Sequence, residues 1–104
     1  MLVTSKKMFA AAQAQQYAIP APNFFDFSSA KTYISVAQRQ NKPLILAFAQ
    51  AHMNLLSLEE AALIGKYLAS EATIPVVLHL DHGTDEALIK TAIDLGFTSV
   101  MIDA

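Results

Sequence analysis

The sequence contains no cysteine and no basic run. The lack of cysteine excludes disulfides, and any metal site must then use histidine and carboxylate side chains. The formal net charge is −2, which favours neither a nucleic acid nor an anionic membrane as a partner. No apolar stretch is long enough to span a bilayer, and no long apolar region follows Lys6 and Lys7 as a signal peptide requires. We therefore expect a cytoplasmic protein that binds neither nucleic acid nor membrane.

Charged residues are also scarce. They make up 15% of the chain, whereas hydrophobic residues make up 54%. This composition excludes a disordered chain. The apolar share is high for a small domain and is typical of a piece of a larger core, because parallel strands are covered on both faces. We expect residues 1–104 to form a single partial domain without linker, repeat or low-complexity segment.

Apolar patterns and capping residues predict helices and strands in regular alternation. The expected strands cover residues 17–23, 44–49, 75–81 and 98–103. The first helix covers 6–15 after Thr4, and the second runs from Ser28 or Ser29 to Asn41. A third helix covers 57–70, where Ser57 and Glu60 match a capping box, and a fourth runs from its cap Thr84 to a left-handed stop at Gly96.

This alternation predicts an α/β fold with parallel strands and right-handed crossovers. An open doubly wound sheet and half of a (β/α)8 barrel are both compatible with it. Residues 22–25 lack the glycines of a nucleotide-binding turn. Pro20 and Pro22 remove two backbone donors from one side of the first strand, so we expect that strand at an edge.

The segment 78–83, Leu-His-Leu-Asp-His-Gly, carries the strongest functional signal. Asp81 and His82 stand where a buried strand ends, and the C-terminal ends of parallel strands are where α/β proteins place their chemistry. Neighbouring strand residues point to opposite faces, so both side chains reach one site only if the chain turns there, and Gly83 permits such a turn. A plain strand-to-helix turn is the alternative interpretation.

Residues 78–83 and 96–103, with Asn23 and the opening residues 1–4, resemble the zinc-dependent class II aldolases. These enzymes cleave fructose 1,6-bisphosphate or tagatose 1,6-bisphosphate to dihydroxyacetone phosphate and glyceraldehyde 3-phosphate. The resemblance covers roughly the first third of the family's length. It implies the N-terminal half of a (β/α)8 TIM barrel, with about four parallel strands alternating with helices. It also implies a zinc cofactor, a phosphorylated ketose substrate and a homo-oligomer.

The resemblance assigns roles to four residues. Asp81 corresponds to the acid that moves a proton at the aldehyde-side oxygen, and His82 to a ligand of the catalytic zinc. Asp103 corresponds to an acid that can bind a second or displaced metal, and Asn23 to a substrate-site amide that can orient the catalytic carboxyl. A polar strand end would equally explain Asp103, and turn chemistry would explain Asn23.

Two further histidines receive structural interpretations. His79 lies inside the apolar strand and is expected to be a hydrogen-bonded structural residue that points away from His82. His52 is expected to be an exposed loop residue. A catalytic zinc needs three protein ligands, and His52, His79 and His82 do not reproduce the family's ligand spacing. We therefore expect the isolated chain to be inactive.

Three hypotheses remain open at this stage. The chain is part of a cytosolic class II aldolase, or a non-catalytic half-barrel that self-associates through its two exposed strand edges. Alternatively, it belongs to a relative with another substrate, because Ala49 stands where many family members have a serine that contacts substrate.

Overall fold

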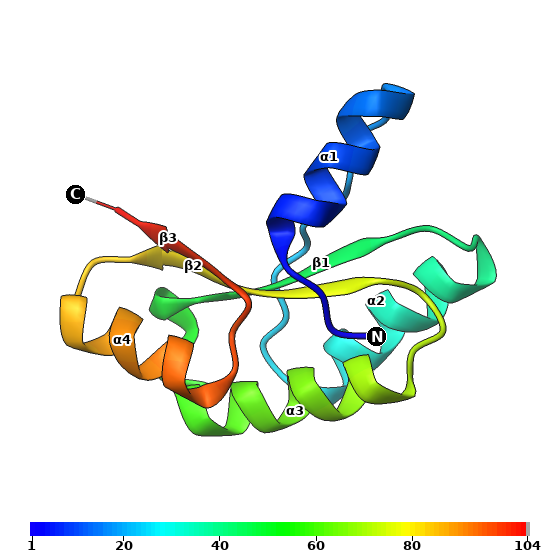
Figure 1. Cartoon of the computed structure of the whole chain (residues 1–104). Helices are drawn as coiled ribbons and strands as arrows, with labels where there is room; N and C mark the ends of the chain where they lie inside the picture. Colours follow the sequence, from blue (N-terminus) through cyan, green and yellow to red (C-terminus); the bar gives the residue numbers. More distant parts are fainter. Residues whose placement is uncertain (104) are drawn as a thin grey trace.

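A parallel three-stranded sheet organises the molecule, and the computed structural model describes residues 1–103. Its strands are β1 (Leu44–Ala49), β2 (Val76–Gly83) and β3 (Ser99–Ile102), in the order β1-β2-β3. The helices are α1 (Ser5–Gln15), α2 (Phe27–Arg39), α3 (Leu58–Glu71) and α4 (Glu86–Leu95), and the short 3-10 helix η1 (Gln50–His52) follows β1. Helices α2, α3 and α4 lie on one face of the sheet and α1 projects from the other (Figure 1).

The main core lies between the sheet and helices α2, α3 and α4. All six residues of β1 are buried, as are the first three of β2. The core includes Phe24 and Phe48, whose ring centroids are 5.6 Å apart. A smaller cluster of Met8, Ile45 and Val77 lies on the opposite face, beneath α1. The sheet is therefore covered on one face by three helices and in part on the other by α1.

The expected strand at residues 17–23 is wrong. The chain there is extended and follows β1, with backbone bonds from Ile45 N–H to Pro20 O and from Ala47 N–H to Pro22 O, both 3.1 Å. It forms one isolated bridge, Asn23 to Ala47, and no regular ladder. Pro22 has no N–H to donate toward Ile45, so a step of the ladder is missing. The sheet thus has three strands and an extended flanking segment in place of four strands.

The other strands agree with the prediction within two residues. β1 has the expected bounds, β2 runs two residues beyond Asp81 to Gly83, and β3 ends one residue before Asp103. The pairing of β2 with β3 shifts register between Leu80 and Gly83, which marks an irregularity at the end of β2.

The helix caps confirm some predictions and correct others. Ser57 and Glu60 form the expected capping box of α3, and Gly96 ends α4 with φ +110°. Helix α2 begins at Phe27, one or two residues earlier than expected, because Asp26 is its cap and accepts a bond from Ser29 N–H. The cap of α4 is Asp85 rather than Thr84. Thr4 stands at the cap position of α1, but its side chain makes no capping bond there.

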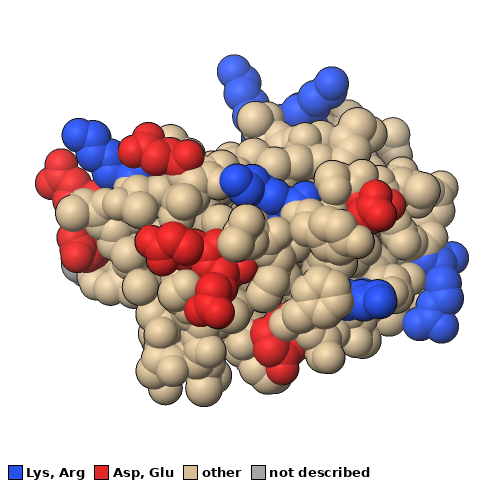
Figure 2. Space-filling model, turned by 90° about the horizontal axis from the view of Figure 1, so that it is seen from below, with Lys and Arg blue, Asp and Glu red and all other residues tan. Residues whose placement is uncertain are grey.

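The outer surface of the helices carries charges of both signs. Figure 2 shows acidic and basic side chains spread over this face, with uncharged surface between them.

Within residues 1–103, no helix is long and apolar enough to cross a membrane.

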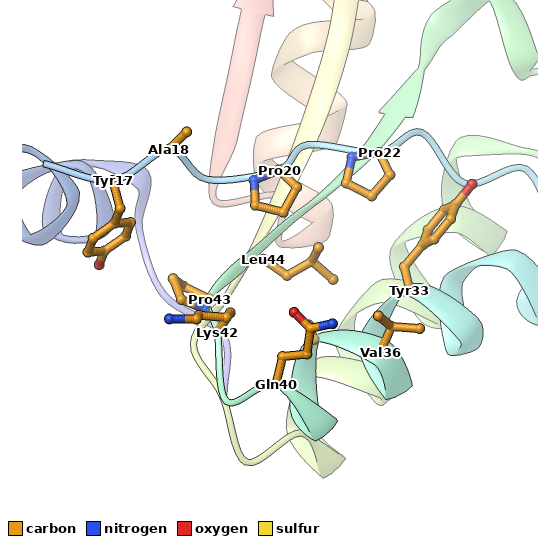
Figure 3. A pocket seen from close by; sticks show the side chains of 11 residues that line it. Tyr17, Ala18, Pro20, Pro22, Tyr33, Val36, Gln40, Lys42, Pro43 and Leu44 are labelled. Atoms are coloured by element: carbon orange, nitrogen blue, oxygen red, sulfur yellow. The ribbon is translucent and has the colours of Figure 1, made fainter.

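A mainly apolar hollow of about 430 Å³ lies between the extended segment and α2 (Figure 3). Its walls include Tyr17, Pro20, Pro22, Tyr33 and Leu44, and Lys42 supplies a charged group. It contains none of the predicted site residues, so we do not assign the chemistry to it.

Candidate active site

The backbone of His82 turns the end of β2. Its φ of +52° lies in the left-handed region, which non-glycine residues seldom adopt. This turn breaks the strand alternation and brings the His82 ring to the same side as Asp81. The sequence prediction placed the turn at Gly83, but Gly83 has no positive φ. Gly83 serves close packing instead, because a Cβ there would lie 2.9 Å from Ile89 Cγ1 and 3.0 Å from the Met101 carbonyl oxygen.

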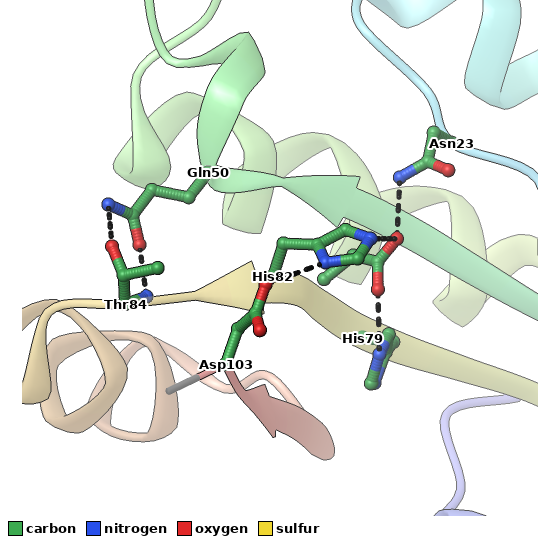
Figure 4. Close-up of polar contacts among 7 residues, drawn as sticks. Asn23, Gln50, His79, His82, Thr84 and Asp103 are labelled. Atoms are coloured by element: carbon green, nitrogen blue, oxygen red, sulfur yellow. Dashed lines mark hydrogen bonds and ion pairs between the residues drawn. The ribbon is translucent and has the colours of Figure 1, made fainter.

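Three side chains surround the carboxyl group of Asp81 (Figure 4). The amide of Asn23 donates a hydrogen bond of 3.3 Å to Oδ2. The Nε2 atom of His82 lies 3.7 Å from the same oxygen, and the Nε2 atom of His79 lies 3.7 Å from Oδ1. The side chain of Asp81 keeps 19% of its exposure, so it is largely enclosed yet accessible. The predicted proximity of Asn23, Asp81 and His82 is therefore present.

Asn23 is itself held in place by backbone and side-chain contacts. It forms the bridge to Ala47 of β1, and its carbonyl oxygen accepts a 3.1 Å hydrogen bond from the hydroxyl of Tyr33 on α2. These contacts set the position of the amide relative to β2. Asn23 can therefore orient the Asp81 carboxyl, as the family resemblance suggested.

His79 is hydrogen-bonded, as predicted, but its expected direction is wrong. Its Nδ1 lies 2.7 Å from the hydroxyl of Ser99, its register partner on β3. Its other ring nitrogen faces Asp81, because residues two apart on a strand share a face. The left-handed turn at His82 then places both histidines beside Asp81. The two-residue spacing of His79 and Asp81 was the signal in the sequence that could have predicted this direction.

The two histidines have opposite pKa shifts. Burial lowers the pKa of His79, and the nearby Asp81 carboxylate offsets part of that effect. The hydrogen bond to Asp103 raises the pKa of the exposed His82, and Asp81 adds to the increase. Two imidazoles with different proton affinities therefore flank one carboxyl group.

His82 and Asp103 lie together, with 3.1 Å between Nδ1 and Oδ2. An imidazole and a carboxylate are suitable zinc ligands, but a catalytic zinc needs three protein ligands and one open position. Within residues 1–103, no group of three His, Cys, Asp or Glu side chains is arranged to hold a metal ion. The two side chains are of the type that binds zinc, but they are one ligand short of a catalytic zinc site.

The loop after β1 reaches the same end of the sheet. Gln50 accepts a 2.8 Å bond from Thr84 N–H and donates a 3.1 Å bond to its hydroxyl. These two bonds join the loops that follow β1 and β2, which explains why Thr84 does not cap α4. His52 is half-buried rather than exposed, its ring lies edge-on to Phe25, and its enclosed Nδ1 has no hydrogen-bond partner among residues 1–103.

Asp81 opens into a hollow of about 540 Å³ beside α1. His79 and Ser99 line the same hollow, and Phe9 of α1 closes part of it. The volume is within the range of small-molecule sites. The sheet end therefore combines an accessible carboxyl, its orienting amide and a space for a ligand.

Comparison with known proteins places this arrangement in a family. The family model described as "Fructose-bisphosphate aldolase class-II" matches residues 3–104. The chain belongs to this family. It is 38% identical to the 6-phospho-5-dehydro-2-deoxy-D-gluconate aldolase of Bacillus subtilis (strain 168), over 97% of this chain and 36% of that protein. It is 34% identical to the fructose-bisphosphate aldolase of Mycoplasma pneumoniae, over 99% of this chain and 36% of that protein.

The structures agree with this family assignment. The chain superimposes on the crystal structure of the YdjI aldolase from Escherichia coli K12 with a TM-score of 0.95 and 29% identity, covering 100% of this chain and 40% of that one. The fold is therefore the N-terminal part of an aldolase TIM barrel. The chain spans about a third of the length of the curated relatives it matches.

Proposed function

We propose that this chain supplies the general acid–base residue of a class II aldol reaction, the reversible carbon–carbon cleavage of a phosphorylated ketose. The observation that carries the proposal is the Asp81 carboxyl at the end of β2, held by the Asn23 amide at 3.3 Å and open to the 540 Å³ hollow. Membership in the aldolase family supports it. A cytoplasmic location and a homo-oligomeric enzyme are part of the same proposal.

In this proposal Asp81 exchanges a proton with the substrate oxygen that becomes the aldehyde carbonyl on cleavage. The Asn23 amide donates to Oδ2, which leaves the other lone pairs of the carboxyl to reach that oxygen. Asn23 therefore orients the carboxyl at the substrate site and moves no proton itself.

Zinc is the proposed cofactor of the complete enzyme, with His82 as a ligand of the catalytic ion and Asp103 as a ligand of a second or displaced metal ion. Their side chains keep 61% and 49% of their exposure, so they are free to meet further ligands. Because two ligands do not make a catalytic zinc site, we expect the isolated 104-residue chain to lack aldolase activity.

Fructose 1,6-bisphosphate and tagatose 1,6-bisphosphate are the proposed substrates, with dihydroxyacetone phosphate and glyceraldehyde 3-phosphate as products. The alternative is a class II aldolase relative with a different substrate. Ala49 favours that alternative, because the serine that many family members have there is absent. The similarity to the 6-phospho-5-dehydro-2-deoxy-D-gluconate aldolase of Bacillus subtilis is a second reason to test it.

A chimera tests the proposal directly. Residues 3–104 replace the matching third of the Mycoplasma pneumoniae aldolase, and cleavage of the two bisphosphates and of 6-phospho-5-dehydro-2-deoxy-D-gluconate is measured with zinc. We expect cleavage of at least one substrate, and a loss of roughly 10²-fold or more in kcat with Asp81→Asn. The control is Asp94→Asn on α4, which should leave kcat unchanged. A folded chimera whose activity is insensitive to Asp81→Asn would refute the role of Asp81.

A further inference from the structure

We propose that Ser99 and His79 form a positioning pair that orients the carboxyl group of Asp81 from the side opposite Asn23. This inference rests on the proposed acid–base role of Asp81 and adds to it two residues that the family resemblance did not single out. The pair spans β2 and β3, where His79 and Ser99 are register partners.

The geometry connects three groups in a row. The hydroxyl of Ser99 lies 2.7 Å from Nδ1 of His79, and Nε2 of His79 lies 3.7 Å from Oδ1 of Asp81. All three residues line the 540 Å³ hollow beside α1 (Figure 4 shows His79 and the contacts of the carboxyl). The side chain of His79 is 16% exposed, so packing restricts its ring orientation.

The chemistry of the row selects one tautomer of His79. A neutral imidazole carries a proton on one nitrogen and a lone pair on the other. An ionised carboxylate has no proton, so it favours Nε2–H and repels a lone pair at that position. Nδ1 then holds the lone pair, and the Ser99 hydroxyl donates to it. Burial lowers the pKa of His79, so its ring stays neutral over a wider pH range than a free imidazole, and a neutral ring has two tautomers to choose between.

The tautomer makes the two oxygens of Asp81 inequivalent. Oδ2 accepts the Asn23 amide, and Oδ1 faces the Nε2–H of His79. At 3.7 Å the second contact is longer than a hydrogen bond, so it acts as an electrostatic restraint on the carboxyl plane. His79 is therefore a positioning residue. A histidine that filled space alone would show no link between Ser99, its tautomer and Asp81.

Nuclear magnetic resonance of the ¹⁵N-labelled chain tests the inference without any activity measurement. Long-range ¹H–¹⁵N spectra distinguish the two tautomers of each histidine at a pH where the ring is neutral. We expect Nε2–H to exceed Nδ1–H at His79 by roughly tenfold, the size that one hydrogen bond of this kind supports. Ser99→Ala should reduce the ratio without reversing it, because Nδ1 loses its hydroxyl donor while the Asp81 carboxylate still favours Nε2–H, and Ser99→Thr should restore it. His52 is the internal reference and should not change.

Asp81→Asn gives a second, independent measurement if Ser99→Ala does not fold. The Asn23 amide is a donor, so it retains the carbonyl oxygen of the new side chain and leaves the new NH₂ facing His79. That donor needs a lone pair at Nε2, and His79 should therefore switch to Nδ1–H.

The inference is overturned if wild-type His79 is mainly Nδ1–H, or if its tautomer ratio is unchanged in both Ser99→Ala and Asp81→Asn. Because the readout needs no turnover, an inactive chimera with the expected tautomers would count against the aldolase reaction alone. An active chimera with unchanged tautomers would count against the positioning pair alone.

Discussion

At the scale of single residues, the left-handed backbone of His82 controls the site. It places the His82 ring beside Asp81 and within 3.1 Å of Asp103, two contacts that a regular strand would not allow together. Left-handed φ values are unfavourable for residues with a Cβ, and the strain at His82 coincides with the residue proposed to bind zinc. The backbone strain therefore falls on the residue whose conformation brings the site together.

Replacing His82 measures this cost. We expect His82→Gly to be more stable to denaturant unfolding than His82→Ala by about 1 kcal/mol, because glycine adopts a φ of +52° without steric strain. The same pair of substitutions at Lys90, an exposed position within helix α4, is the control. There the order should reverse, with Gly less stable than Ala by about 1 kcal/mol. An equal stability of the two His82 variants would show that the left-handed turn is not strained.

The opposite pKa shifts of His79 and His82 give a pH prediction. His82 has a raised pKa, so its contribution to stability is present below the unfolded value of about 6.5 and is lost as the pH rises through the folded value. His79 has a lowered pKa, so its contribution is present above about 6.5 and is lost as the pH falls.

Ring resonances of the two histidines, followed by NMR against pH, check this prediction. The midpoint of His82 should lie above that of His79. Asp103→Asn should lower the His82 midpoint, because the hydrogen bond to Asp103 is the main cause of its rise. Asp94→Asn is the matched control and should leave it unchanged. Coincident midpoints would contradict the geometry of the site.

The sequence was sufficient to place Asn23, Asp81 and His82 at one site. The end of the strand can be recognised from neighbouring residues, and the resemblance to the aldolase family brought Asn23 to the same site. It was not sufficient for His79. Its direction relative to His82 depends on one backbone angle, and residue type alone does not determine that angle. His52 was also misplaced, since the burial of a loop residue depends on what packs over it.

At the scale of elements, helix α3 packs unusually close to β2. A Cβ at Gly65 would overlap the side chain of Leu78, including Cδ1 and Cδ2. Leu78 is fully buried, so it cannot move aside without disturbing the core. Gly65 therefore sets the distance between α3 and the strand that carries Asp81.

A double-mutant cycle tests this packing. Gly65→Ala should destabilise the protein by about 1 kcal/mol or more, because overpacking exceeds the gain in helix propensity. Leu78→Val removes a methylene at the point of contact. We expect the double variant to be more stable than the sum of the single effects by about 1 kcal/mol in denaturant unfolding. Additive effects would indicate that the Cβ at residue 65 is accommodated elsewhere.

Most elements could be predicted from patterns within the chain. Burial of β1 and the capping box of α3 follow from local residue order, and both are confirmed. The segment 17–23 could not be assigned in this way. Its apolar pattern favours a strand, whereas the missing donor of Pro22 matters only when Ile45 lies opposite, and that is a tertiary relation.

At the scale of the whole molecule, the sheet has an exposed edge. Within residues 1–103, β3 pairs with β2 and with no other strand, and Ile102 is 76% exposed. Unpaired apolar edges recruit other edges. The chain also spans about a third of the relatives it matches, so a closed barrel needs strands other than these.

We expect the isolated chain to self-associate through β3. Sedimentation velocity over a range of concentrations should show reversible association. Ile102→Lys should weaken it, because a charge at the edge opposes pairing. Leu63→Lys is the matched control, since Leu63 is 66% exposed but lies on helix α3. A monomer at every concentration would contradict self-association, and equal effects of both variants would locate it away from the edge.

The order of elements, the buried strands and the position of Asp81 at a strand end were already present in the sequence, because apolar periodicity and capping act between near neighbours. The family resemblance added the barrel, which periodicity left undecided. The tertiary structure was needed for the contacts between distant residues: the bond of Asn23 to Asp81, the register of His79 with Ser99 and the incomplete ladder at Pro22. These contacts depend on how separate elements pack, and each is set by backbone angles and register that no local pattern encodes.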